Sequence, residues 1–137
     1  MQDILIGLLA WIGGQTGYNT ELDLPNVSLT EPYNVCQNYG ISHKGQCDAA
    51  RLTGFYNKHY TIYLQNRFNI NNKHDRSALM HELVHYVQWS NAQQKSTCLG
   101  KLEVEAYTLQ DQWRHKHQLA AVLDPFRKIM LESSCDE

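Results

Sequence analysis

The sequence predicts a single α+β domain that spans residues 1–137. Segments whose apolar residues recur at helical spacing flank short runs rich in β-branched and aromatic residues, and 137 residues suit one hydrophobic core rather than two. Apolar residues make up 42% of the chain and charged residues 19%, which is typical of a folded globular protein. We find no repeat, low-complexity tract or linker that would divide the sequence.

A helix is predicted near the N-terminus, because apolar side chains recur at helical spacing between Ile4 and Ile12. Gly13-Gly14 is expected to end it, with Gly17 as a second breaker. The stretch is far shorter than the roughly 20 residues of a membrane span. No Lys or Arg precedes it, as one would in a signal peptide. We therefore expect a core helix, no membrane span and, if the protein is exported, a signal that this sequence lacks.

Short strands are predicted after this helix. Residues 24–29 alternate apolar and polar side chains after a proline, which favours a strand. Residues 31–50 hold a proline, two glycines and two cysteines, and are expected to form a loop braced by a disulfide. Residues 54–56 and 60–64 are β-rich runs separated by the turn-like residues 57–59, which predicts a hairpin.

Three helices are predicted in the C-terminal half, over about residues 77–91, 102–119 and 126–131. The first follows the polar loop 66–75, with Asp75 or Ser77 as its capping residue. Asp124-Pro125 interrupts the chain before the last, short helix.

The composition limits the kinds of binding partner and the cellular compartment that we expect. The formal net charge is −2 and the twelve Lys and Arg residues are scattered, so no nucleic-acid partner is expected. The four cysteines form no C-x-x-C pair, which argues against a cysteine-based zinc site and favours two disulfides. We expect Cys36–Cys47, which closes a short loop, and Cys98–Cys135, which holds a polar tail. We therefore expect a secreted or periplasmic protein. The alternative is a cytosolic protein with four buried free thiols.

The helix expected from residue 77 carries the motif His81-Glu82-Leu83-Val84-His85. Two histidines four residues apart lie on one helix face, where both imidazoles can reach a single ion. Glu82 lies about 100° around the helix, where a general base can take a proton from a zinc-bound water. Gln88 lies on the histidine face, and the opposite, apolar face carries Leu79, Leu83, Tyr86 and Val87. This two-face pattern favours a catalytic site over a chance motif.

A catalytic zinc ion takes three protein ligands and keeps one position for water or substrate, so a third ligand is needed. No Gly-x-x-His follows His85, and His115 and His117 have no matching spacing. Glu103 and Glu105, on the next expected helix, are better candidates. They lie about 200° apart around the helix axis, so only one of them can face the ion. Their spacing alone leaves both open.

His81-Glu82-Leu83-Val84-His85 followed by Glu103-Val104-Glu105-Ala106-Tyr107 resembles the gluzincins, zinc peptidases whose third ligand is a glutamate on a downstream helix. The pattern HELVHxxQ…ExEAYxxQ is also similar to uncharacterised bacterial metallopeptidase-like domains, over about residues 75–113. The resemblance implies a zincin-like fold, with a small sheet and the HExxH helix packed on the glutamate-bearing helix. In that fold an edge strand, here residues 60–64, binds the substrate backbone.

The resemblance also implies roles for single residues. The Glu-x-x-Ala spacing makes Glu103 the ligand, with Ala106 packed against the active-site helix and Glu105 left as a supporting or surface group. Many relatives carry an acid four residues after the ligand that orients a metal-bound histidine. This chain departs from that pattern with Tyr107, so either Tyr107 takes that role or the support is built otherwise. Candidates for stabilising the oxyanion are Tyr107, Arg114, His115 and His117.

The expected function is zinc-dependent hydrolysis of a peptide or protein substrate, with one zinc ion per chain held by His81, His85 and Glu103. Glu82 is the expected general base. The first alternative is a non-catalytic zinc-binding or interaction domain that keeps the HExxH helix. The second is a disulfide-stapled structural protein with a fortuitous motif, whose melting temperature zinc chelators would not change.

Overall fold

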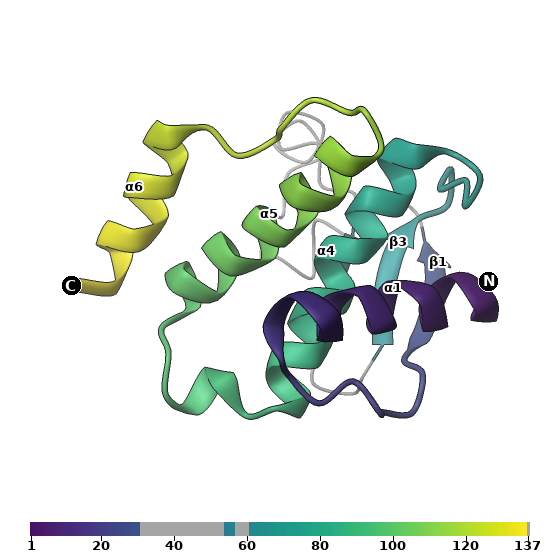
Figure 1. Ribbon diagram of the computed structural model, residues 1–137, viewed down its shortest axis with the longest axis horizontal. Coiled ribbons are helices and arrows are strands. Elements are labelled where there is room, and N and C mark those ends of the chain that lie inside the picture. The colour runs from purple at the N-terminus through teal and green to yellow at the C-terminus, as the bar shows by residue number, and fades with distance from the viewer. Residues whose placement is uncertain (31–53, 57–60, 137) are drawn as a thin grey trace.

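The computed structural model describes residues 1–30, 54–56 and 61–136 (Figure 1). These residues form an α+β arrangement, which confirms the predicted class. Its helices are α1 (Gln2–Thr16), α4 (Lys73–Ser90), α5 (Leu99–Lys116) and α6 (Pro125–Ser133), and its strands are β1 (Asn26–Thr30), β2 (Gly54–Tyr56) and β3 (Thr61–Gln65). Two short 3-10 turns, η1 (Gln93–Lys95) and η2 (Ser134–Asp136), follow α4 and α6.

The three strands form one sheet in the order β1-β3-β2. β2 pairs antiparallel with β3, with Phe55 opposite Tyr63, so the predicted hairpin pairing is confirmed; its turn lies outside the described residues. β1 runs parallel to β3 on the other side, with Val27 opposite Ile62. The strand over residues 60–64 is therefore central, and its prediction as the edge strand was wrong. A parallel partner about 35 residues away in sequence leaves no local signal in the strand it joins.

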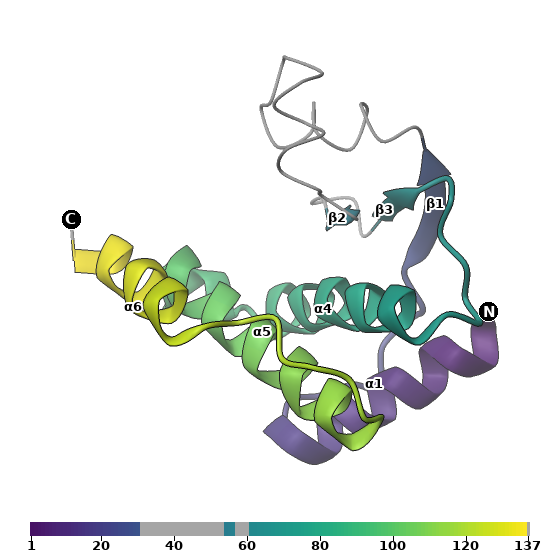
Figure 2. The same cartoon turned by 90° about the horizontal axis from the view of Figure 1, so that it is seen from above.

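Helix α4 lies at the centre of the fold, between the sheet on one side and α1 and α5 on the other (Figure 2). Its predicted apolar face is buried in the main core, as are the inward faces of its neighbours. The core side chains include Leu5, Leu8, Leu9 and Ile12 of α1, Ile62 and Leu64 of β3, Leu79, Met80, Leu83, Val84, Tyr86 and Val87 of α4, and Ala106, Leu109 and Trp113 of α5.

Two predicted ends of helices were wrong for reasons that the structure makes clear. α1 continues through Gly13-Gly14 to Thr16, because burial of its apolar face outweighs the weak helix propensity of the two glycines. It ends at Gly17, whose φ of 78° is the left-handed conformation that closes helices. α4 begins four residues before the predicted start, where the Asn72 side chain accepts a hydrogen bond from the Asp75 backbone N–H at 3.2 Å. Asn72, rather than Asp75 or Ser77, is its cap.

The C-terminal end of α6 is held against the start of α5. The predicted disulfide Cys98–Cys135 is present, with 5.7 Å between its Cα atoms. Gly100, buried at the start of α5, lies so close to α6 that a Cβ there would come within 2.0 Å of the Leu131 carbonyl oxygen. At its other end, α6 begins at Pro125 after the Asp124 cap, which confirms the predicted break. The predicted Cys36–Cys47 bond and the loop 31–50 fall outside the described residues.

Helix α5 is shifted toward the N-terminus relative to its prediction. It starts at Leu99, directly after the disulfide cysteine, and ends at Lys116 rather than near residue 119. None of the helices in the described part of the chain has the length and apolar character that a membrane span requires.

Candidate metal centre

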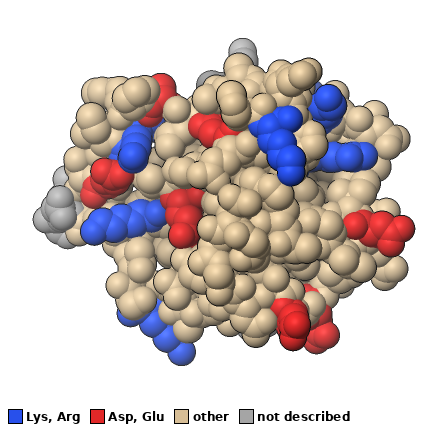
Figure 3. Space-filling view, in the orientation of Figure 1, with Lys and Arg blue, Asp and Glu red and all other residues tan. Residues whose placement is uncertain are grey.

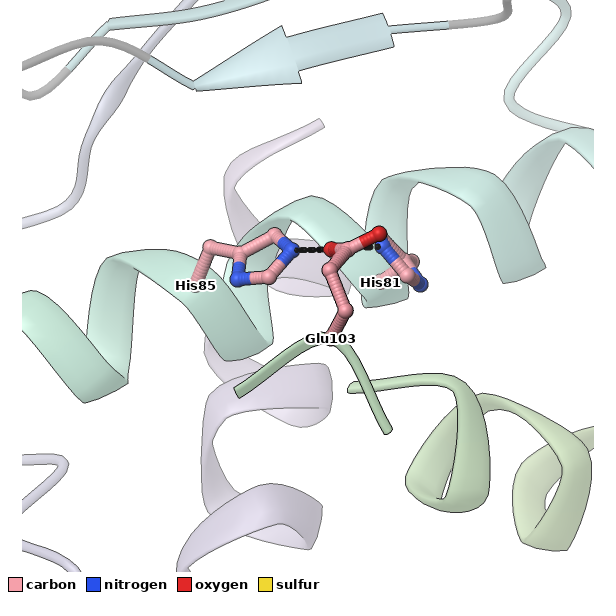
Figure 4. A group of neighbouring side chains, drawn as sticks. All are labelled: His81, His85 and Glu103. Atoms are coloured by element: carbon pink, nitrogen blue, oxygen red, sulfur yellow. Dashed lines mark hydrogen bonds and ion pairs between the residues drawn. The ribbon is translucent and has the colours of Figure 1, made fainter. Parts of the chain in front are cut away.

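Three side chains from two helices converge at the α4–α5 contact. The rings of His81 and His85 on α4 point toward the carboxylate of Glu103 on α5 (Figure 4). One ligand atom from each of the three residues lies within 4.8 Å of the other two. His81 Nε2 is 3.2 Å from Glu103 Oε1, and His85 Nε2 makes a hydrogen bond to the same oxygen. This group can hold a metal ion.

The structure places the two candidate glutamates in different surroundings. Glu103 reaches both histidines, whereas the Glu105 carboxylate accepts hydrogen bonds from the Tyr18 hydroxyl and from Gln88 Nε2. Ala106 is fully buried in the core that α4 and α5 share. The choice between the two acids therefore follows from the face that α5 turns toward α4.

Both imidazoles are held in one orientation by glutamine amides. His81 Nδ1 is 3.0 Å from Gln110 Oε1, and His85 Nδ1 is 2.9 Å from Gln88 Oε1. A carboxamide oxygen only accepts, so each Nδ1 carries the proton and donates it. In the neutral form of each ring, the lone pair is then on Nε2 and points toward Glu103, as metal binding requires.

The electrostatics of the three groups are strongly coupled. Burial alone raises the pKa of Glu103, but its hydrogen bonds with His81 and His85 outweigh burial and lower the pKa well below the ordinary range. Burial lowers the pKa of His85, but its hydrogen bond to Glu103 and the charge of Glu82 outweigh it and raise that pKa. A positive charge on His85 and the negative charge of Glu103 thus stabilise each other.

Glu82 lies beside this group and is 5% exposed. Burial raises its pKa, while the positive charge of His81 and His85 acts in the opposite direction. Its Oε2 atom is buried and has no hydrogen-bond partner among the described residues. A buried oxygen without a partner is costly unless it faces a polar ligand. Two imidazole nitrogens and the Glu103 carboxylate oxygen fit the donor set of a zinc site that keeps one position open, and the Glu82 oxygen lies beside that set rather than in it.

Sequence reasoning missed the supporting roles of Gln88 and Gln110. Gln88 follows His85 by three residues, and Gln110 follows Glu103 by seven, so each lies on the same helix face as a candidate ligand. The Nε2 atom of Gln110 lies 3.4 Å from Ser77 Oγ. The same Ser77 oxygen accepts a hydrogen bond from Arg114 Nη1 at 2.8 Å. Helical spacing from the ligands was a signal that could have found both amides.

Among the four candidates for oxyanion stabilisation, the structure puts Tyr107 beside the site. Its ring centroid is 4.4 Å from that of His81, and its hydroxyl accepts a hydrogen bond from Arg127 Nη2 of α6 at 2.7 Å. The Arg114 guanidinium is buried and donates to Ser77 and to the Ala120 carbonyl. His117 packs against Trp113, with 4.0 Å between ring centroids, and His115 is exposed.

The surface around the helices carries charges of both signs. Acidic and basic side chains are interspersed on the face in Figure 3, and uncharged residues cover most of that face.

Comparison with known proteins assigns a family. A family model described as a domain of unknown function, DUF6647, matches residues 1–137. No curated protein and no solved structure matches the chain. The chain, with its His81–His85–Glu103 group, therefore belongs to the DUF6647 family.

Proposed function

We propose that this chain is a zinc metallopeptidase of the gluzincin type. The observation that carries the proposal is the convergence of His81, His85 and Glu103, with both imidazoles oriented so that Nε2 faces the carboxylate. An ordinary surface pair of histidines at helical spacing has no need of two buried amides that fix its tautomers. Two nitrogen ligands and one oxygen ligand suit zinc among the common divalent metals.

Each residue has a distinct part in the proposed reaction. Bound zinc supplies Lewis acidity, which lowers the pKa of a coordinated water and polarises the scissile carbonyl. Glu82 takes a proton from the attacking water and delivers it to the leaving nitrogen. Burial raises the pKa of Glu82, so its carboxylate is a stronger base than an exposed glutamate. Tyr107, held by Arg127, is the group proposed to donate a hydrogen bond to the developing oxyanion.

We place the substrate on β2 rather than on β3. β3 has a strand on each side and offers no edge, whereas β2 has only β3 as a strand partner in the part of the chain that the structure describes. β2 also packs against α4, the helix that carries the histidines. An extended peptide could pair its main chain with the other edge of β2. The Cys98–Cys135 disulfide fits an oxidising compartment, and we propose a secreted or periplasmic enzyme.

The test measures zinc and turnover on the same preparations. Wild type should bind one zinc ion per chain, and the His81→Ala/His85→Ala variant should bind none. Glu82→Gln should keep zinc and cleave peptides about 10²–10⁴-fold more slowly than wild type, because only the general base is lost. Glu132→Gln, which makes the same change at an exposed position of α6, serves as the control and should keep full activity.

Three other outcomes would contradict the proposal in different ways. A wild type without zinc, even after the metal is added back, would leave only a structural role for the motif. Zinc without cleavage of any peptide in a library would indicate a non-catalytic zinc-binding domain. Equal turnover by wild type and Glu82→Gln would exclude Glu82 as the base.

A further inference from the structure

A chain of hydrogen bonds leads from His85 to the partly buried carboxylate of Glu105 behind it. His85 Nδ1 donates to Gln88 Oε1, and Gln88 Nε2 donates to Glu105 Oε1 at 3.0 Å. The Tyr18 hydroxyl lies 2.9 Å and 3.0 Å from the two oxygens of the same carboxylate. Gln88 is completely buried, so the middle of this His85–Gln88–Glu105 relay is shielded from solvent, while Glu105 and Tyr18 are partly exposed.

The relay is held in place from both ends. Gln88 Nε2 also donates to the Leu102 carbonyl at 2.9 Å, which fixes the amide between α4 and α5. Tyr18 is followed by Asn19, whose backbone makes two hydrogen bonds of 3.0 Å with the side chain of Asn91 at the end of α4. The Tyr18 hydroxyl is therefore presented to Glu105 by a segment that is itself anchored.

The second ligand histidine has the opposite charge behind it. Gln110, the amide that accepts from His81, faces Ser77, and Ser77 accepts from the buried guanidinium of Arg114. A carboxylate behind an amide polarises it and makes its oxygen a better acceptor, which makes the imidazole on that oxygen a better electron donor. The Arg114 guanidinium, one hydrogen bond further from its histidine, gives no such assistance.

We propose that Glu105 is a positioning residue that acts through Gln88 to make His85 the stronger of the two histidine ligands. The inference deepens the proposed function, since it rests on a metal bound by His81, His85 and Glu103. It assigns a role to the acid that is not a ligand. It also explains how a site with neutral amides on both histidines obtains negative charge behind one of them.

A purely structural role for Glu105 predicts different results from the same variants. Glu105→Gln keeps an oxygen that can accept from Tyr18 and from Gln88, and removes only the charge. A structural role therefore predicts unchanged metal affinity, whereas the relay predicts a loss of about tenfold. The double variant Gln88→Glu/Glu105→Gln exchanges the acid and the amide, so that a carboxylate accepts from His85 directly. The relay predicts that this exchange restores the affinity to that of wild type or above.

The experiment measures zinc affinity by competition with a chromophoric chelator, together with the melting temperature of each metal-free protein. The visible spectrum of the Co²⁺-loaded proteins reports the ligand field independently of turnover. Glu132→Gln is the matched charge control and should bind zinc as wild type does. A Glu105→Gln protein with wild-type affinity would overturn the inference. So would a double variant that binds no better than Glu105→Gln while its metal-free melting temperature is unchanged.

The test separates this inference from the proposed function. If wild type binds no zinc, the metal centre itself fails. If wild type binds zinc and all Glu105 variants bind it equally, the relay fails and the metal centre stands. If the variants lose zinc affinity but wild type cleaves no peptide, the relay stands and the peptidase fails.

Discussion

His81 and His85 lie one turn apart on α4, and a glutamine amide accepts from the Nδ1–H of each. Beyond those amides the two sides differ. The His85 side ends at the Glu105 carboxylate and the Tyr18 hydroxyl, whereas the His81 side ends at Ser77 and the Arg114 guanidinium. Two histidines that look equivalent along the helix are therefore backed by opposite charges.

This difference shows that the groups behind each histidine are determined by the elements that pack around it. The Gln88 side faces the segment after α1 and the first turns of α5. The Gln110 side faces the first turns of α4 and the last turns of α5, where Arg114 also binds the Ala120 carbonyl at 2.7 Å. Arg114 thus joins the support of His81 to the loop that follows α5. Variants of the two amides can separate these contributions.

Among the variants that test this comparison, those that remove one of the two amides should change zinc affinity the most. Gln88→Leu should weaken zinc binding by about 100-fold and Gln110→Leu by about tenfold, because only the first also disconnects an anion from its histidine. Chelator competition measures both losses, and the melting temperatures of the metal-free proteins show whether each variant folds. Equal losses would mean that Glu105 adds nothing, and a larger loss for Gln110→Leu would reverse the comparison.

Variants that replace each amide by an acid should change zinc affinity less, and they test the role of the charge behind each histidine. Gln110→Glu should strengthen zinc binding by about tenfold, because the new carboxylate accepts from His81 and has Arg114 nearby to balance its charge. Gln88→Glu alone should bring no gain, since it faces the like charge of Glu105. Zinc titrations of the two single variants measure this directly. A gain from Gln88→Glu equal to that from Gln110→Glu would show that the charges behind the amides do not matter.

Tyr18→Phe should give the smallest change in zinc affinity, about threefold or less, because Glu105 keeps its hydrogen bond from Gln88. Its clearer signature is the pH dependence of stability. Burial and the hydrogen bond to Glu105 raise the pKa of Tyr18 from 10.0 to about 12. The neutral phenol therefore contributes stability that is fully present below pH 10 and is lost as the pH rises through 12. Thermal melts of metal-free protein should show a steeper loss over that range in wild type than in Tyr18→Phe.

Much of the site could be predicted because it depends on local geometry. The positions of His81, Glu82 and His85 follow from the period of one helix, and so does the burial of the face that carries Leu83 and Val87. The antiparallel pairing of β2 with β3 also followed from spacing along the chain, and the Cys98–Cys135 disulfide was expected because it holds the polar C-terminal tail.

The sequence could not reveal which groups lie behind the ligands. Tyr18 and Glu105 are 87 residues apart and meet only because α1 and α5 both pack on α4. Gln110 and His81 are 29 residues apart and lie on different helices. Hydrogen bonds across such separations depend on how helices pack. The spacing of apolar residues along each helix does not specify that packing.

The sequence by itself determined that two histidines share one helix face, with an acid beside them and two candidate acids on the next helix. Those statements need only the 3.6-residue period and the chemistry of side chains. Only the tertiary structure decided that Glu103 joins the histidines, that Glu105 stands behind His85 and that β3 is the central strand. The physical reason is the same in all three cases, because each depends on how separate elements come together in the folded chain. Burial of the whole core sets that choice.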